Sequence, residues 1–532
     1  MTTSNDLYEW MVQLLMRDAP KLDDESLLQR IECIAILAFE SAPTLLNDPR
    51  LEALIQGVAK RLESMALPPS PVLTESPRRV LHVTTGIHRV GGHTRIIMNW
   101  VRADRERRQS LVVTYRDGEI TEWMRQSLAE VGCDLIELGR HGESRLERAR
   151  QLRKLIREGG YELIISHHFP NDTVTFTALG VEGLPQVYVF NQGDHVYWLG
   201  VAMADAVLDF RAKARDITER VRGARRSLPL PYILEPQSDE PGREEARRIV
   251  GLQSWKTILV SMARVQKFVP CLDYNLHRTL LPVLQSHPDT VLVLIGLDRD
   301  DYLRLFKAEP PPNVLPMGRV DHPSLLLRAA DIWIEPMPWG SALASFDACR
   351  HGAVPMFVYG QAPCIYGTTV SDLFEGSGCE EVTANEVEYQ ARLTQMIADV
   401  SLRQMLSAKV KAFCKRGYLS PGWNDSLNAA YQQAVGGKHQ VNQLGLVCYE
   451  NTPSFQYYSQ CMSEDLAKHA ALCMRLLEYV VRWRDLIWIV VFFVIHRLRN
   501  PSLSGCRCML RFVKTSLLHF AAHPSAGQLN HG

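Results

Sequence analysis

The chain has 532 residues, enough for about three domains, since single domains commonly span ~100–200 residues. Hydrophobic residues make up 46% of it and aromatic residues 8%, which is enough to bury several cores and excludes a wholly disordered chain. The 59 Lys and Arg balance 59 Asp and Glu, so the chain lacks the overall basic field that holds nucleic acid. We therefore expect a globular protein with no nucleic-acid partner.

Cysteine usage and the apolar segments predict the compartment. The twelve cysteines include no Cys-x-x-Cys pair, which is typical of a reducing compartment and gives no sign of a structural zinc site. The first residues lack the basic start and apolar core of a secretory signal. The apolar run at 486–495 has ten residues, whereas a bilayer crossing needs ~20. We expect a cytoplasmic protein, with association at the inner membrane face left open.

The first 77 residues predict a helical unit followed by a linker. Leu7, Trp10, Met11 and Leu14 show helical rather than alternating spacing, and similar spacing continues through residues 1–66. These residues predict a helical cap. Four prolines in the eleven residues 67–77 remove hydrogen-bond donors and disfavour helix, so this stretch predicts a linker.

From residue 78 onward, short β-branched runs alternate with helical stretches, a pattern that predicts parallel sheets covered by helices on both faces. The first series of predicted strands is 80–84, 110–114, 134–138, 162–166 and 186–190. The second series is 257–261, 290–295, 313–316, 331–335 and 353–357. The predicted fold class is α/β: two Rossmann-like, doubly wound domains, at 78–225 and 226–435, facing a cleft where ligands of such sheets bind.

Residues 436–532 predict an Arg- and Cys-rich helical appendage. Between 475 and 514 an apolar segment is flanked by arginines. Such a helix either lies on an anionic membrane surface or packs on the protein with the arginine stems over apolar surface. Both interpretations stay open.

The first strand of the N-terminal domain runs directly into Thr84-Thr-Gly-Ile-His-Arg-Val-Gly-Gly-His-Thr-Arg95. Glycines at this bend allow backbone N–H groups to approach a ligand at the start of the next helix, near Thr94. We expect His93 to point into the cleft, with Gly91, Gly92 and Thr94 near the acceptor. The alternative is a plain tight turn, and the run does not match the Gly-x-Gly-x-x-Gly pattern of dinucleotide sites.

Two more clusters, at 166–172 and 191–200, follow strands and so share the carboxyl edge of the sheet. Histidine titrates near neutrality and can take a proton from an acceptor hydroxyl. Each histidine has the alternative of being an ordinary hydrogen-bonded loop residue. The predicted catalytic candidates are His93, His167, His195 and Asp194, with His168 lining the acceptor side.

In the C-terminal domain, Arg264 and Lys267 come just after a strand, where two cations can neutralise a diphosphate. The alternative is two solvated charges. Asp298-Arg-Asp300 has the form of a metal-binding Asp-x-Asp motif, but it opens a predicted helix, and acidic residues are favoured there. We predict no metal and no cofactor besides the co-substrate.

The stretch Gly318–Pro355, with its Pro336-Met-Pro-Trp-Gly340 turn, resembles GT-B glycosyltransferases. The resemblance covers about residues 78–435, and the enzymes that the chain resembles include group-1/4-like bacterial glycosyltransferases. The turn is more similar to the O-linked N-acetylglucosamine transferase group. The resemblance implies that the turn and the helix start hold a donor diphosphate, that an acidic residue contacts the ribose and that nearby backbone faces the base. The residues implied for the diphosphate are Gly340, Ser341, Ser345, Arg264 and Lys267. Asp347 is implied for the ribose, and Arg319 is implied near the base.

Retaining bacterial members of this superfamily usually carry a Glu-x7-Glu pair, whereas this chain has Trp339 and Asp347 at those places. The resemblance thus favours inversion, in which a histidine of the N-terminal domain acts as base. It implies a metal-independent transferase that moves a sugar from a nucleotide-sugar, with UDP the first guess, to a protein, glycan or lipid-linked acceptor. The alternatives are a nucleotide-sugar epimerase and a degenerate transferase that only binds.

Overall fold

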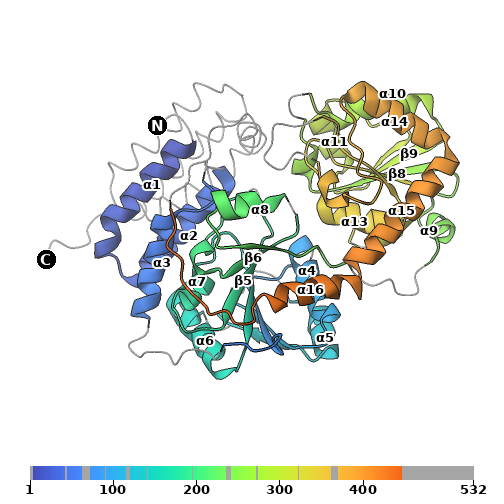
Figure 1. Cartoon of the computed structure of the whole chain (residues 1–532). Coiled ribbons are helices and arrows are strands. Elements are labelled where there is room, and N and C mark those ends of the chain that lie inside the picture. Colours follow the sequence, from blue (N-terminus) through green and yellow to red (C-terminus); the bar gives the residue numbers. More distant parts are fainter. Residues whose placement is uncertain are drawn as a thin grey trace.

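The structure is a computed structural model of the chain (Figure 1). It describes residues 4–41, 45–62, 72–89, 91–115, 120–139, 142–194, 196–211, 213–234, 241–270, 273–321, 323–360 and 369–445. The predicted catalytic candidate His195 lies outside the described residues, as does nearly all of the predicted appendage and its apolar segment.

The N-terminal lobe is built on one seven-stranded sheet in the order β3-β2-β1-β4-β5-β6-β7, and every neighbouring pair is parallel. Runs such as Leu163–His167 are buried along their whole length, as expected when helices cover both faces. The strands are β1 (Arg79–Thr84), β2 (Arg108–Val113), β3 (Asp134–Glu137), β4 (Leu163–His167), β5 (Gln186–Phe190), β6 (Ala206–Asp209) and β7 (Ser227–Pro229).

The helices of this lobe connect the strands in sequence order. Ser144 caps α6 by accepting a hydrogen bond from Glu147 N (3.2 Å), and Asp172 caps α7 through Thr175 N (2.8 Å). Each of these N-cap residues ends a loop at the carboxyl edge of the sheet. The helices are α4 (Gly92–Ala103), α5 (Glu122–Glu130), α6 (Arg145–Glu158), α7 (Thr173–Leu179) and α8 (Ala214–Asp216), with the short helical turns η2 (Val201–Met203) and η3 (Ile217–Val221).

The predicted helical cap forms α1 (Ser4–Asp18), α2 (Asp24–Ser41) and α3 (Pro49–Arg61), with the turn η1 (Ala19–Lys21). Figure 1 shows these helices, in blue, along one side of the N-terminal lobe, where α2 and α3 pack against α6 and α7. Arg145 joins the two units through ion pairs with Glu25 (3.1 Å) and Glu32 (2.6 Å). The cap is thus an integral part of this lobe's packing.

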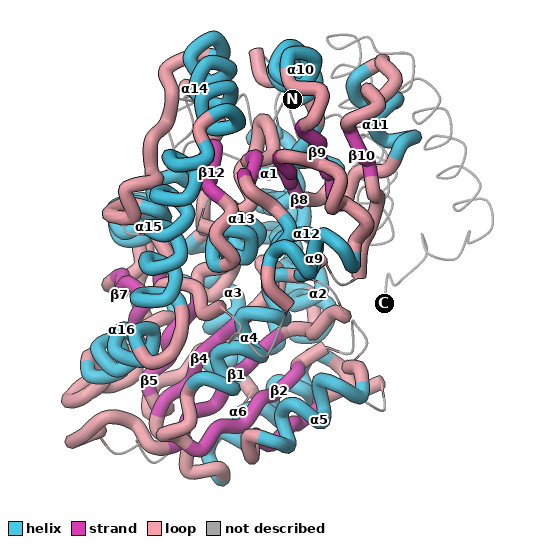
Figure 2. The backbone as a smooth tube through the Cα atoms, turned by 90° about the vertical axis from the view of Figure 1, so that its right-hand side faces the viewer, coloured by secondary structure: helices cyan, strands magenta, loops and turns pink. Residues whose placement is uncertain are grey.

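The C-terminal lobe contains a five-stranded parallel sheet in the order β10-β9-β8-β11-β12. Its strands are β8 (Thr257–Met262), β9 (Thr290–Ile295), β10 (Val314–Pro316), β11 (Ile332–Ile334) and β12 (Val354–Met356). Its helices are α9 (Arg243–Ile249), α10 (Leu276–Ser286), α11 (Arg299–Phe306), α12 (Ser324–Ala329), α13 (Ala342–Arg350), α14 (Glu386–Ala398) and α15 (Val400–Tyr418), with η4 (Val265–Phe268) and η5 (Ser371–Phe374). Figure 2 shows the two sheets as separate groups of strands.

After α15 the chain returns to the N-terminal lobe as α16 (Gly422–Gln432). The fully buried Trp423 packs edge-on against Trp100 of α4, with ring centroids 5.5 Å apart, and its indole N–H donates to Pro231 O (2.8 Å). Residues after α16 stay on this lobe, where buried His439 lies 2.7 Å from Asp205. Helix α16 therefore ties the two lobes together on the side of the crossover at 230–234.

The α/β fold class with two doubly wound lobes is confirmed, and all ten predicted strands are present with small shifts at their ends. β6 and β7 were not predicted. Among the residues that the structure describes, no helix is both long and apolar enough to cross a bilayer.

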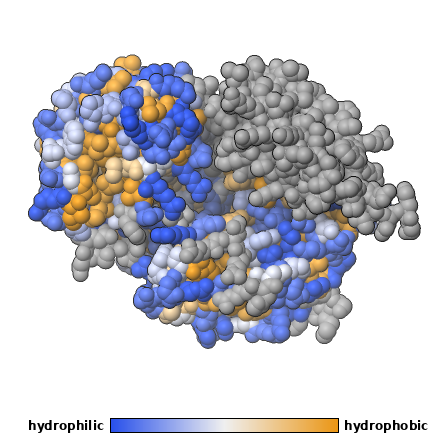
Figure 3. All heavy atoms as spheres, turned by 180° about the vertical axis from the view of Figure 1, so that it is seen from behind, coloured by the Kyte–Doolittle hydropathy of each residue, from blue (hydrophilic) through white to orange (hydrophobic). Residues whose placement is uncertain are grey.

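The two lobes meet through helices and loops that follow the carboxyl ends of their strands. Arg95 of α4 pairs with Asp347 of α13, and Arg211, just after β6, pairs with Asp372 of η5. In the face shown in Figure 3, hydrophilic side chains border the place where the described parts of the lobes approach each other. The carboxyl edges of both sheets are therefore brought together, as the sequence predicts.

Candidate active site

Two cations predicted for the donor diphosphate lie on and beside η4, directly after β8. Lys267 donates from Nζ to Gly340 O (2.5 Å), which joins this turn to the loop before α13. Burial lowers the pKa of Lys267 to about 8, and the carboxylate of Glu335 opposes that shift. Arg264 begins the same turn with an exposed side chain. The structure thus brings Lys267 and Gly340 together, with Arg264 three residues away on the same turn.

The start of α13 provides backbone donors beside these cations. Ser341 is the N-cap residue, and its hydroxyl makes no cap bond to the helix. Its carbonyl accepts from both the backbone N–H and the hydroxyl of Ser345 (2.9 Å each). Ser345 is fully buried, so its hydroxyl is directed into its own helix. A helix N-terminus with unsatisfied N–H groups favours an anionic group.

Asp347, the predicted ribose contact, is buried and already holds a side chain from the other lobe. Arg95 donates from Nη1 to Oδ2 (2.5 Å) and from Nη2 to Oδ1 (3.0 Å), which is a bidentate ion pair. Arg350 Nε lies 3.7 Å from Oδ1 on the inner side. Arg319, the residue predicted near the base, is exposed in the loop after β10 and lies 3.5 Å from Asp321.

Glu335, directly after β11, is a buried carboxylate for which the sequence suggested no role. It accepts hydrogen bonds from the backbone N–H groups of Val358 and Val370 (2.7 Å each). Burial raises its pKa to about 7, against the lowering effect of these bonds and of the Lys267 charge. Glu335 therefore holds the segments that contain Val358 and Val370, and its charge stabilises the ammonium of Lys267.

In the N-terminal lobe, His93 lies in the first turn of α4 and is half-buried. Its Nε2 is 2.9 Å from Thr84 Oγ1, and its ring meets Phe169 edge-on at 5.0 Å between centroids. Burial lowers its pKa to about 4, and a hydrogen bond to the Gln192 side chain opposes that shift. The ring is therefore neutral at pH 7 and able to accept a proton.

The predicted backbone around His93 is arranged as a helix start. Gly91 is the N-cap residue of α4, with φ of 143°, a conformation that favours glycine, and a Cβ there would meet only open space. A Cβ on Gly92 would lie 2.6 Å from Leu343 Cδ1, so the two lobes touch here. Thr94 Oγ1 accepts a hydrogen bond from His88 N (2.9 Å).

The other two described histidines of the predicted site are buried in the lobe. His167 is 0% exposed, with its Nε2 3.0 Å from His82 Nδ1 and its ring against Trp100. Burial holds the pKa of His167 well below its usual range. His168 packs edge-on against Phe176 and Trp198, and burial lowers its pKa to about 3. Both residues are buried, whereas His93 is half-buried.

Asp194, the fourth catalytic candidate, belongs to a buried charge group at the lobe boundary. Its Oδ2 lies 3.5 Å from Arg211 Nη1, and the same guanidinium donates to both carboxylate oxygens of Asp372 (2.9 and 2.5 Å). All three side chains are less than a tenth exposed. Asp194 thus lies at the lobe boundary but shares its charge with Arg211.

The site contains residues that sequence reasoning missed: Arg95, Arg211, Glu335 and Asp372. Glu335 offered one signal, because a carboxylate directly after a buried strand is rarely free of function or partner. The arginines offered none, since a single arginine in a helix or loop gives no indication of a partner in another lobe.

Asp298 acts as the helix start that the sequence suggested, since its Oδ1 accepts from Asp301 N (2.8 Å) at the beginning of α11. Among the described residues, no group of three or more His, Cys, Asp and Glu side chains is placed to hold a metal ion.

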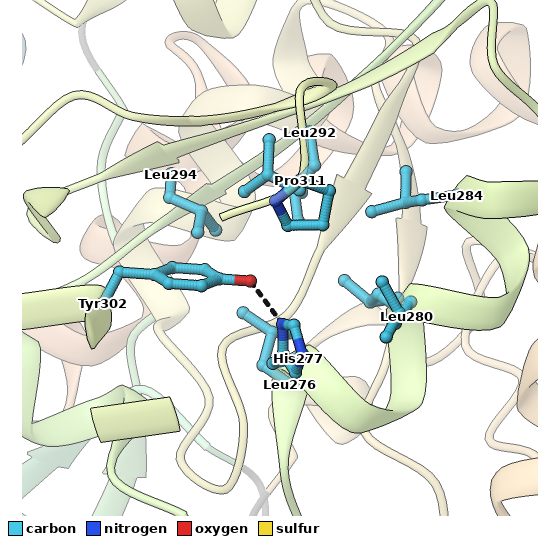
Figure 4. A pocket seen from close by; sticks show the side chains of 10 residues that line it. Leu276, His277, Leu280, Leu284, Leu292, Leu294, Tyr302 and Pro311 are labelled. Carbon is cyan, nitrogen blue, oxygen red and sulfur yellow. Dashed lines mark hydrogen bonds between the residues drawn. The ribbon is translucent and has the colours of Figure 1, made fainter. Parts of the chain in front are cut away.

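A small pocket lies within the C-terminal lobe, between α10, β9 and α11 (Figure 4). Leucines line it, with His277 Nδ1 bonded to Tyr302 Oη (2.5 Å). Its volume is about 10 Å³, roughly the space of one water molecule. It is therefore a packing gap, and it does not compete with the lobe boundary as a ligand site.

Comparison with solved structures shows the same fold. A mutant of Thermobaculum terrenum O-GlcNAc transferase is 15% identical over 76% of this chain and 77% of its own, with a TM-score of 0.53. Anabaena HepE in complex with UDP and glucose is 13% identical over 67% of this chain and 100% of its own (TM-score 0.48). The glycosyltransferase WaaG of lipopolysaccharide biosynthesis is 14% identical over 67% and 100% (TM-score 0.43).

No protein-family model matches the sequence, and no curated protein matches it. The resemblance to GT-B glycosyltransferases is confirmed at the level of the fold.

Proposed function

We propose that this chain is a glycosyltransferase that moves a sugar from a nucleotide-sugar in the C-terminal lobe to a hydroxyl acceptor held against the N-terminal lobe. The observation that carries the proposal is the arrangement around α13. Lys267 binds the carbonyl of Gly340 one residue before the Ser341 helix cap, and Arg264 lies on the same turn. Cations and open N–H groups at one point suit a diphosphate.

In this proposal the diphosphate is the leaving group, and Lys267, Arg264 and the N-terminus of α13 stabilise the charge that develops on it. Such preorganised groups act without a metal ion being required at the leaving group. UDP is the first donor to test, because the resemblance to GT-B glycosyltransferases implies a preference for UDP donors. Asp347 would accept hydrogen bonds from the ribose.

His93 is the proposed base. It is half-buried at the carboxyl edge of the N-terminal sheet, and its lowered pKa keeps it neutral under ordinary conditions. Thr84 and Phe169 hold the ring in place. A neutral imidazole can remove the proton of an acceptor hydroxyl as the hydroxyl attacks the sugar. A single displacement of this kind inverts the anomeric centre, in line with the missing Glu-x7-Glu pair.

The test uses the full chain in calorimetric titrations and thermal melts with UDP, GDP, ADP and CMP and their common sugar conjugates. A ligand that binds only the folded state at 100 times its Kd adds about 2.7 kcal/mol of stability. Selective binding, followed by sugar release to an added protein, glycan or lipid-linked acceptor, supports the proposal. Interconversion of the free nucleotide-sugar indicates an epimerase, and binding without turnover indicates a degenerate transferase. A folded chain that binds no member of the panel contradicts the proposal.

A further inference from the structure

The ion pair between Arg95 and Asp347 occupies the carboxylate that a donor ribose is proposed to use. Asp347 is 3% exposed, and both of its oxygens accept from the Arg95 guanidinium. The two residues are 252 positions apart and belong to different lobes. Figure 1 shows α4 and α13 on either side of the lobe boundary.

A ribose hydroxyl cannot reach Asp347 while this contact stands. The Asp347 side chain has almost no exposed surface, and the start of α4 lies directly against α13, with Gly92 beside Leu343. Either the guanidinium leaves or the two helices separate before a ribose can bond there. In both cases the Arg95–Asp347 pair must break.

The surroundings of the carboxylate are suited to such an exchange. The Arg95 side chain is 38% exposed, so it can leave towards solvent. Arg350 approaches Asp347 from the inner side at 3.7 Å and is only 5% exposed. When Arg95 leaves, Asp347 therefore keeps a fixed cation nearby. A buried carboxylate without any partner would be costly, and Arg350 lowers that cost.

We infer that Arg95 is a gate on the ribose subsite: it competes with the ribose hydroxyls of the donor for Asp347 and so sets the apparent donor affinity. The inference rests on the proposed function. A nucleotide that needs Asp347 binds only the fraction of molecules in which the pair is open, and its apparent Kd rises by the inverse of that fraction. A nucleotide without ribose hydroxyls does not need Asp347.

The test is calorimetric titration of the full chain with UDP and with 2′,3′-dideoxyuridine diphosphate, which lacks both ribose hydroxyls. With a pair that is open about a tenth of the time, Arg95→Ala binds UDP about tenfold more tightly than the wild type. The dideoxy nucleotide binds both proteins equally. If Arg95→Ala proves unstable in a thermal melt, Arg95→Gln replaces it, because glutamine keeps most of the side chain without the charge. We expect the same gain in UDP affinity from this variant.

Arg89→Ala is the matched control. Arg89 also faces the C-terminal lobe, 4.0 Å from Asp321, but its side chain is 60% exposed and does not touch Asp347. Removing this charge leaves UDP affinity unchanged, whereas an equal gain in Arg89→Ala would mean that general loosening of the lobes, and not the ribose subsite, explains the effect.

Two other outcomes overturn the inference in distinguishable ways. If the wild type binds UDP and Arg95→Ala binds it equally or more weakly, only the gate is overturned. Arg95 then either contacts the donor directly or has no part in binding it. The absence of any nucleotide binding by the wild type, Arg95→Ala and Arg95→Gln overturns the proposed function and the gate with it.

Discussion

Lys267 is the residue whose replacement tests the donor site most directly. Its ammonium lies 2.5 Å from Gly340 O beside the cap of α13, where a diphosphate is proposed to bind. Lys267→Met keeps the length and apolar character of the stem and removes the charge. A hydrogen bond to a charged group is worth ~1.5–3 kcal/mol, which corresponds to about 10- to 150-fold weaker binding of UDP. Calorimetric titration at pH 7 measures this loss.

The pH dependence gives the same test a second readout. Burial lowers the pKa of Lys267 to about 8, and the protonated form is the one that binds a diphosphate. The lysine is therefore about 90% charged at pH 7 and about 10% charged at pH 9 in the free protein. UDP affinity should fall as the pH rises through about 8, and Lys267→Arg, which stays charged, should remove this dependence.

Arg264→Met is the comparison. The Arg264 side chain is exposed, so solvent screens its charge and its loss should weaken UDP binding less than the loss of Lys267. The reasoning is refuted if the wild type binds UDP and Lys267→Met binds it within twofold of the wild type. It is also refuted if the wild-type affinity stays constant between pH 7 and pH 9.

The remaining predictions concern the base and the stability of the lobes. His93→Ala should lower turnover by about 10²- to 10⁴-fold and leave UDP affinity unchanged. In the wild type, the acidic limb of the pH–rate profile should lie near pH 4, below the usual histidine range. A limb near pH 6.5 would contradict this assignment. His82 and His168 are buried and neutral, with pKa values lowered to about 4 and about 3. Because the unfolded chain therefore binds more protons than the folded chain below pH 6.5, each histidine should lower the free energy of unfolding by about 2 kcal/mol between pH 7 and pH 5. Urea unfolding at the two pH values measures this loss. His168→Gln should remove its share of that acid sensitivity. Trp423→Ala should lower the free energy of unfolding by about 3–5 kcal/mol in the same assay, because it empties a fully buried site and deletes the hydrogen bond to Pro231 O. A loss below about 1 kcal/mol would show that α16 does not hold the lobes together.

The strands of both sheets could be predicted because they are buried on both faces and appear as continuous β-branched runs. Gln186–Phe190 and Thr290–Ile295 were predicted with the bounds that the structure has. β6 and β7 were missed for a physical reason. Ala206–Asp209 offers only three apolar residues, and Ser227–Pro229 is a three-residue edge strand ending in proline, a residue that edges tolerate. Short strands of this kind are specified by their neighbours.

The position of Arg264 and Lys267 could be predicted, because a side chain that follows a strand lies at the carboxyl edge of the sheet. The same rule did not separate His93 from His167. His167 is the last residue of β4, and when both faces of a sheet are covered, alternation does not tell which side chains are solvent-facing. The ion pairs of Arg95 and Arg211 depend on lobe packing, because their partners are 252 and 161 positions away in the sequence, so nothing local in the sequence indicates them.

The charges around the proposed donor site link the two lobes more closely than the fold alone requires. Three carboxylates of the C-terminal lobe are buried there, and each has a cation: Glu335 has Lys267, Asp347 has Arg95 and Asp372 has Arg211. Two of these three cations come from the N-terminal lobe. A donor diphosphate would add negative charge at the same place and compete for the same cations. Under the proposed function, donor binding and the contact between the lobes share one set of charges, so a change in either is expected to alter the other.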